Sequence, residues 1–64
     1  MTVAMTYLHN GYEVLLLTDE LHAQWYVSLS DGTSQKLLTC LGCAHGLRIF
    51  DETVDRIRKD KWLN

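Results

Sequence analysis

The stretch Tyr7-Leu8-His9-Asn10-Gly11-Tyr12-Glu13-Val14 sets an Asn-Gly pair between two runs of strand-forming residues. Both central positions of the tightest hairpin turns need a positive φ angle, which glycine reaches freely and asparagine at small cost. The stretch therefore predicts a hairpin whose strands cover residues 3–9 and 12–18. A two-residue turn also sets the register of this hairpin, with Tyr7 opposite Val14.

A second turn signal, Asp31-Gly32, separates two further strand-like runs. The run before it alternates cleanly between apolar and other side chains, which is typical of a half-buried strand. We therefore expect a third strand over residues 23–29 and a fourth over residues 34–41. With the first hairpin, these strands predict a four-stranded antiparallel meander.

The connection between the two hairpins predicts which residues share a face of the sheet. A four-residue loop over 19–22 would place Leu16 opposite Trp25, and directly opposite residues share a face. Leu38 and Cys40 join that face if the second turn has two or four loop residues. The expected apolar face then contains Val3, Met5, Tyr7, Tyr12, Val14, Leu16, Trp25, Val27 and Leu29.

The period of the apolar residues changes after Gly42, from two to that of a helix. We predict a helix over residues 44–60, with Trp62 folding back as a lid. An alternative makes residues 47–50 a short strand and Asp51 the N-cap of a shorter helix. The helical stripe that would face the sheet consists of Leu47, Phe50, Val54 and Ile57.

These patterns predict an α+β fold, a four-stranded antiparallel meander packed on one face by a single C-terminal helix. The chain has 64 residues, so residues 1–64 form one small domain. A chain of about this length buries only ~60% of the surface that its unfolded form exposes. Its core is therefore marginal, and a second copy or a partner would stabilise it.

The opposite face of the sheet has more apolar side chains than a solvent-exposed sheet face usually has. One helix covers one face, and antiparallel sheets commonly leave the other in water. Single exposed leucines are common on protein surfaces, whereas a cluster of exposed apolar side chains more often marks an interface. The alternative is that Trp62-Leu63 or the N-terminal residues cover the cluster. The predicted partner-binding or dimer-binding residues are Leu8, Leu15, Leu17 and Tyr26.

Cys40-Leu41-Gly42-Cys43, with His45 two residues on, is the strongest chemical motif in the chain. Thiolates and imidazole bind zinc, and a cysteine near a helix start can be redox active. The spacing of the histidines matches no common zinc pattern, however, and the chain is too short for a thioredoxin-like unit. We expect two small buried side chains, no metal site and no cofactor. No motif supports a reaction, so we expect that the protein is not an enzyme.

A nucleic-acid surface is the main alternative to a protein-binding one. The formal net charge is −2, with eight acidic and six basic residues, which gives no broad attraction to phosphates. A sheet-based DNA-binding module nevertheless remains open, as does a zinc-stabilised interaction module. The bases that such a DNA-binding module would use are Lys36, Arg48, Arg56, Arg58, Lys59 and Lys61.

The sequence favours a cytoplasmic protein that does not enter a membrane. Residues 1–5 lack the basic segment of a secretory signal, no apolar run reaches the ~20 residues that span a bilayer, and two cysteines are too few for a disulfide framework. The expected function is a small regulator or inhibitor that docks on a larger macromolecular complex, or pairs with itself as a homodimer. Small acidic chains of this kind are frequent in phages and mobile elements.

Overall fold

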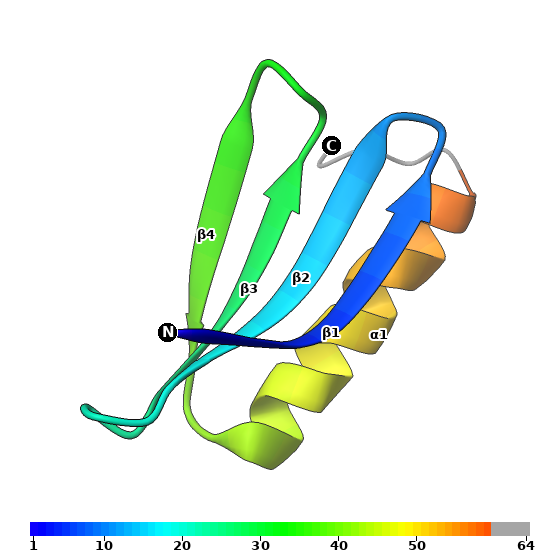
Figure 1. Ribbon diagram of the computed structural model, residues 1–64. Coiled ribbons are helices and arrows are strands. Elements are labelled where there is room, and N and C mark those ends of the chain that lie inside the picture. Colours follow the sequence, from blue (N-terminus) through cyan, green and yellow to red (C-terminus); the bar gives the residue numbers. More distant parts are fainter. Residues whose placement is uncertain (60–64) are drawn as a thin grey trace.

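The computed structural model describes residues 1–59. One antiparallel sheet has the strand order β1-β2-β3-β4, and α1 crosses one of its faces (Figure 1). This arrangement confirms the predicted α+β fold. Trp62 and Leu63, the residues expected to form a lid, lie outside the described residues. The elements are β1 (Thr2–His9), β2 (Tyr12–Asp19), β3 (Gln24–Ser30), β4 (Gln35–Cys40) and α1 (Cys43–Arg58).

The first hairpin closes through Asn10 and Gly11, which have φ angles of 49° and 83°. Tyr7 lies opposite Val14, as the two-residue turn predicts. An irregularity between Val3 and Met5 then shifts the register, so that Val3 lies opposite Leu17. The prediction that Val3 faces the helix is therefore wrong, because a bulge moves the residues beyond it to the other face.

The second connection differs from the predicted loop. Asp19 belongs to β2 and pairs with Gln24, so the loop covers residues 20–23 and Leu16 lies opposite Val27. The Asp19 side chain holds this loop, since its Oδ2 lies 2.9 Å from His22 Nδ1 and its Oδ1 accepts the His22 backbone N–H. The predicted pairing of Leu16 with Trp25 is wrong by two residues. A shift of two preserves the faces, because side chains alternate with a period of two.

The third connection contains four residues, 31–34, with Gly32 at a φ of 93°. Asp31 Oδ1 accepts the backbone N–H of Thr33 at 3.0 Å and that of Ser34 at 2.8 Å. The even loop length brings Leu38 opposite Val27 and Cys40 opposite Trp25. Both residues therefore share the helix-facing side of the sheet, as expected for a loop of this length.

The helix begins at Cys43 with Gly42 as its N-cap and no side-chain cap. It runs through residues 47–50 without a break, so the alternative of a short strand there is wrong. Its buried residues are Gly46, Phe50, Thr53 and Ile57, whereas Leu47 remains 40% exposed. The predicted stripe is therefore rotated, and Gly46 takes the place expected for Leu47.

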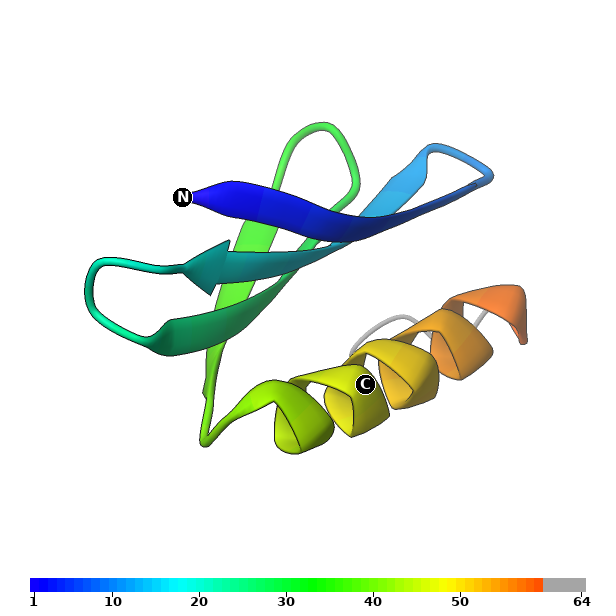
Figure 2. The same cartoon turned by 60° about the horizontal axis from the view of Figure 1, so that its bottom comes forward.

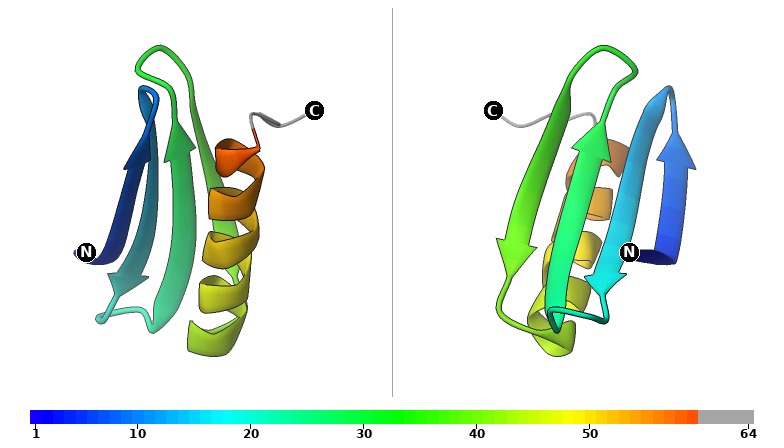
Figure 3. Two further views of the ribbon diagram at one scale, coloured as in Figure 1. Left: turned by 90° about the vertical axis from the view of Figure 1, so that its right-hand side faces the viewer. Right: turned by 60° about the vertical axis from the view of Figure 1, so that its left-hand side comes forward.

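The core lies between α1 and the two central strands, as the different views show (Figures 2 and 3). Phe50 and Ile57 of α1 pack against apolar side chains of the sheet. The Thr53 hydroxyl, between them, donates a hydrogen bond to the Ile49 carbonyl oxygen at 2.7 Å. The opposite face of the sheet carries no layer among the described residues. The buried apolar residues are Val14, Leu16, Val27, Leu29, Cys40, Phe50 and Ile57.

Candidate functional site

The sheet face that points away from α1, here called the outer face, is the candidate site (Figure 3). Directly opposite residues share a face, so the strand register defines three rows of side chains across it. The first row is mainly apolar, the second is half apolar and half polar, and the third is mainly polar. The rows are Val3-Leu17-Tyr26-Thr39, Thr6-Leu15-Ser28-Leu37 and Leu8-Glu13-Ser30-Gln35.

Six residues from all four strands form the outer apolar patch. Leu8, Leu37 and Val3 are 67%, 53% and 51% exposed, while the other three are half-buried by their neighbours. Together these side chains expose apolar area to water on one face of the sheet, which is unfavourable. The outer apolar patch consists of Val3, Leu8, Leu15, Leu17, Tyr26 and Leu37.

All four predicted binding residues lie on this face, and the structure adds Val3 and Leu37 to them. The alternation of the fourth strand already placed Leu37 on the outer face, and its 53% exposure shows that it extends the patch. The position of Val3 on the outer face could not be predicted, because only the bulge turns its side chain outward. The sequence contains no common signal for a bulge at that place.

Polar residues border the outer apolar patch at both ends of the strands. Asp19 and Gln24 pair at one end, and Glu13, Ser30 and Gln35 lie in the row at the other end. Lys36 is opposite the buried Leu29 and therefore lies on the helix side of the sheet. Within residues 1–59, the three rows and the Asp19-Gln24 pair include two carboxylates and no Lys or Arg.

Ser28 is a buried polar residue at the centre of the outer face. It is only 2% exposed, although it lies on the side of the sheet away from α1. Its hydroxyl accepts a hydrogen bond from Gln35 Nε2 at 2.9 Å, and its row neighbours Leu15 and Leu37 flank it. The Ser28 hydroxyl, which lies among the residues of the outer apolar patch, therefore already has a hydrogen-bond partner.

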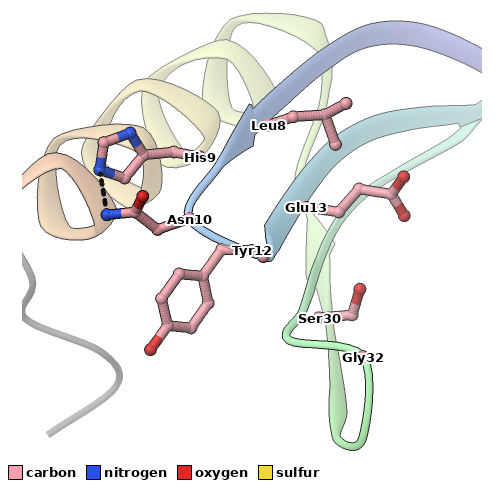
Figure 4. Close-up of a pocket in the computed structure, with 8 residues that line it drawn as sticks. Leu8, His9, Asn10, Tyr12, Glu13, Ser30 and Gly32 are labelled. Carbon is pink, nitrogen blue, oxygen red and sulfur yellow. Dashed lines mark hydrogen bonds between the residues drawn. The ribbon is translucent and has the colours of Figure 1, made fainter.

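A shallow hollow at the end of the sheet is open to solvent (Figure 4). Leu8, Glu13 and Ser30 point to the outer side of the hairpin in this view, while His9 and Tyr12 point toward the helix side. The His9 ring also stacks on Tyr7, with ring centroids 6.2 Å apart. The hollow thus extends the polar end of the outer face. It is lined by Leu8, His9, Asn10, Gly11, Tyr12, Glu13, Ser30 and Gly32.

Three carboxyl groups near the loops are held in their ionised form. A hydrogen bond from the His22 side chain lowers the pKa of Asp19, and the Thr2 side chain lowers the pKa of Glu20 in the same way. The backbone N–H of Ser34, followed by that of Thr33, lowers the pKa of Asp31. The loops at both ends of the sheet therefore carry negative charge at neutral pH.

The cysteine motif is split between the core and the surface. Cys40 is buried beneath α1, and this burial raises the pKa of its thiol, whereas Cys43 is exposed at the start of α1. The expectation that both cysteines are buried is wrong for Cys43. His45 Nδ1 accepts the backbone N–H of Leu41 at 2.9 Å, so the ring ties the β4–α1 connection to the helix. Within residues 1–59, no three His, Cys, Asp or Glu side chains come close enough to hold a metal ion.

The basic residues of the helix lie away from the outer face. Lys59 Nζ contacts Asp55 Oδ2 at 3.0 Å, as the i,i+4 spacing predicts. Arg48, Arg56 and Arg58 are exposed on α1. The positive charge of the described residues is therefore concentrated on the opposite side of the molecule from the outer apolar patch.

Comparisons of the chain with protein-family models, with curated proteins and with solved structures found no match. Among residues 1–59, no helix is both long and apolar enough to cross a membrane.

Proposed function

We propose that the protein is a non-enzymatic regulator or inhibitor that docks on a larger protein complex through the outer apolar patch. The observation that carries the proposal is an apolar surface that crosses all four strands and is covered by no layer of the described residues. Monomeric soluble proteins rarely leave a contiguous apolar surface of this kind in water unless it binds something.

The free energy available from the patch is large for a domain of this size. Burial of apolar surface contributes roughly 25 cal/mol per Å², so covering side chains as exposed as Leu8 and Leu37 would contribute a few kcal/mol. The polar residues at both ends, such as Asp19 and Gln35, match the polar rim that surrounds an apolar interface centre. A bound domain of this kind acts by occupying a surface of its partner.

The charges of the outer face favour a protein over a nucleic acid as the partner. Glu13 and Asp19 place carboxylates at its two ends, and no Lys or Arg of residues 1–59 lies in its rows. DNA-binding surfaces need bases that replace the counterions of the phosphates. The charge distribution therefore gives the sheet-based DNA-binding module much less support.

Leucine-to-glutamate variants test the proposal in the native host. Leu8→Glu and Leu37→Glu each place a charge on a side chain that is already more than half exposed, so the fold should tolerate them. Leu21→Glu is the matched control, because Leu21 is 87% exposed in the 20–23 loop. Each tagged variant is purified with its bound proteins, and its thermal unfolding is recorded to show that it remains folded.

The expected result is a protein that the wild type and Leu21→Glu retain and that both patch variants lose at least ~10-fold, because a buried unpaired charge costs several kcal/mol. The proposal would be wrong if folded Leu8→Glu and Leu37→Glu retained the same proteins in the same amounts as the control. It would also be wrong if no protein were retained by the wild type.

A further inference from the structure

The two edge strands of the sheet differ in how they are protected from pairing with another strand. β4 carries Lys36 on the helix side of the sheet, and a charge in that place is a common way to block edge-to-edge association. β1 has no Asp, Glu, Lys, Arg or Pro anywhere in Thr2–His9. Its bulge near Val3 leaves Met5–His9 in regular pairing with β2. The β1 edge is therefore open over a regular, uncharged segment.

The edge of β1 is also poorly covered by the other described residues. Every second residue of an edge strand directs its backbone N–H and C=O away from the neighbouring strand, and in the described chain β1 pairs with β2 alone. Helix α1 packs mainly on the central strands. It leaves Met5, on its own side of the sheet, 41% exposed, and Leu8 on the outer face is 67% exposed.

We propose that β1 pairs antiparallel with β1 of a second copy of the chain, so that the two sheets become one continuous sheet. In such a two-fold pairing, any charged residue near the axis would face the same charge in the other copy, which is unfavourable. β1 has no Asp, Glu, Lys or Arg, so pairing of β1 with itself brings no two such charges together. A second copy can therefore pair with this edge without like-charge repulsion between the two β1 strands.

The pairing would extend both layers of the molecule. Met5, Leu16, Val27 and Leu38 form one row on the helix side, and the pairing would bring the helix-side residues of a second β1 alongside this row. On the outer face, Val3 and Leu8 lie on β1, so the two outer apolar patches would adjoin. This inference concerns the edge of the sheet, a surface distinct from the one used in the proposed function.

Sedimentation equilibrium of the purified chain tests the pairing, with a lysine added to either edge of the sheet. Thr6→Lys places the charge on β1, and Thr39→Lys is the matched control, because Thr39 is also an exposed threonine of the outer face but lies on β4. The wild type and Thr39→Lys should sediment with twice the monomer mass. Thr6→Lys should raise the dimer dissociation constant ~10-fold or more, because it adds two like charges to the paired segment.

Leu37→Glu separates edge pairing from a face-to-face dimer. It lies on the outer face of β4, away from the β1 edge, so it should leave the dimer mass unchanged. Amide hydrogen exchange should slow in β1, and not in β4, as the protein concentration rises. A wild type that stays monomeric at millimolar concentration would overturn the pairing. So would a dimer that survives Thr6→Lys or dissociates in Leu37→Glu.

Discussion

Gly46 of α1 lies so close to Leu16 of β2 that a Cβ built on the glycine would be 3.0 Å from Leu16 Cδ1. Leu16 is 1% exposed and belongs to the core, so its side chain has little room to move. This approach sets how closely the start of the helix rests on the sheet. It also explains why Gly46, rather than Leu47, occupies the buried stripe.

We predict that Gly46→Ala lowers the free energy of unfolding by about 1 kcal/mol. Alanine gains up to ~1 kcal/mol in helix propensity, whereas overpacking a well-filled core costs about 1–3 kcal/mol. Leu16→Val removes the atom that the new methyl group meets. In a double-mutant cycle by urea unfolding, Gly46→Ala should therefore cost less in the Leu16→Val background.

A stabilising Gly46→Ala would show that the helix does not rest on Leu16 as closely as described. Equal effects of Gly46→Ala in both backgrounds would show that the two positions are not coupled.

Ala23 closes the 20–23 loop with a φ of 53°, a conformation that costs a non-glycine residue roughly 1 kcal/mol or more. We expect Ala23→Gly to raise the free energy of unfolding by about 0.5–1 kcal/mol, since glycine adopts this angle without a steric penalty. Ala44→Gly, at the second position of α1, is the control and should lower stability by a smaller amount, because the cost of glycine is greatest in the middle of a helix. Thermal unfolding of both variants checks the opposite signs, and a loss in both would contradict the loop geometry.

Asp31 should make stability depend on pH through its hydrogen bonds to Ser34 and Thr33. These bonds lower the pKa of the folded carboxyl, so its contribution is full above the unfolded pKa and is lost as pH falls through the folded one. The amide oxygen of Asp31→Asn can still accept these bonds, but the group no longer titrates. We expect the variant to melt below the wild type at pH 7, with the gap closing below about pH 4.

Thr33→Val provides a graded version of the same test. It removes the hydroxyl that donates to Asp31 Oδ1 at 3.0 Å and leaves both backbone donors in place. It should therefore lose only part of the pH-dependent stability. A melting-temperature gap between the wild type and Asp31→Asn that stays constant from neutral pH to below the carboxyl range would exclude this role for Asp31.

Local signals in the sequence were sufficient for the order and type of the elements. Asn10-Gly11 and Asp31-Gly32 indicate turns, because these residue types readily adopt the positive φ angles of hairpin turns. The change in spacing of the apolar residues after Gly42 indicates the helix. The faces of β2 and β3 were also predicted, although their register was wrong by two residues. That error arose because Asp19 and His22 close the loop through side-chain contacts, which no turn signal of the sequence encodes.

The remaining differences depend on tertiary structure. One is the bulge that turns Val3 outward, and the other is the close approach of Gly46 to Leu16. Both depend on contacts between elements that are distant in the sequence. A register shift of two residues does not change which face a side chain points to. The sequence could therefore place four residues on the outer face correctly: Leu8, Leu15, Leu17 and Tyr26. Neither Val3 nor the packing around Ser28 could be derived in that way.

A photo-crosslinking residue at position 37 is the most direct test that the outer apolar patch binds a partner. In the native host, a crosslinker in place of Leu37 should form an adduct with one defined protein, and one in place of the exposed Arg48 on α1 should not. Adding Leu17→Glu to the position-37 chain should abolish the adduct. Adducts that form equally well from position 48, or that persist with Leu17→Glu, would contradict the assignment of this face as the binding surface.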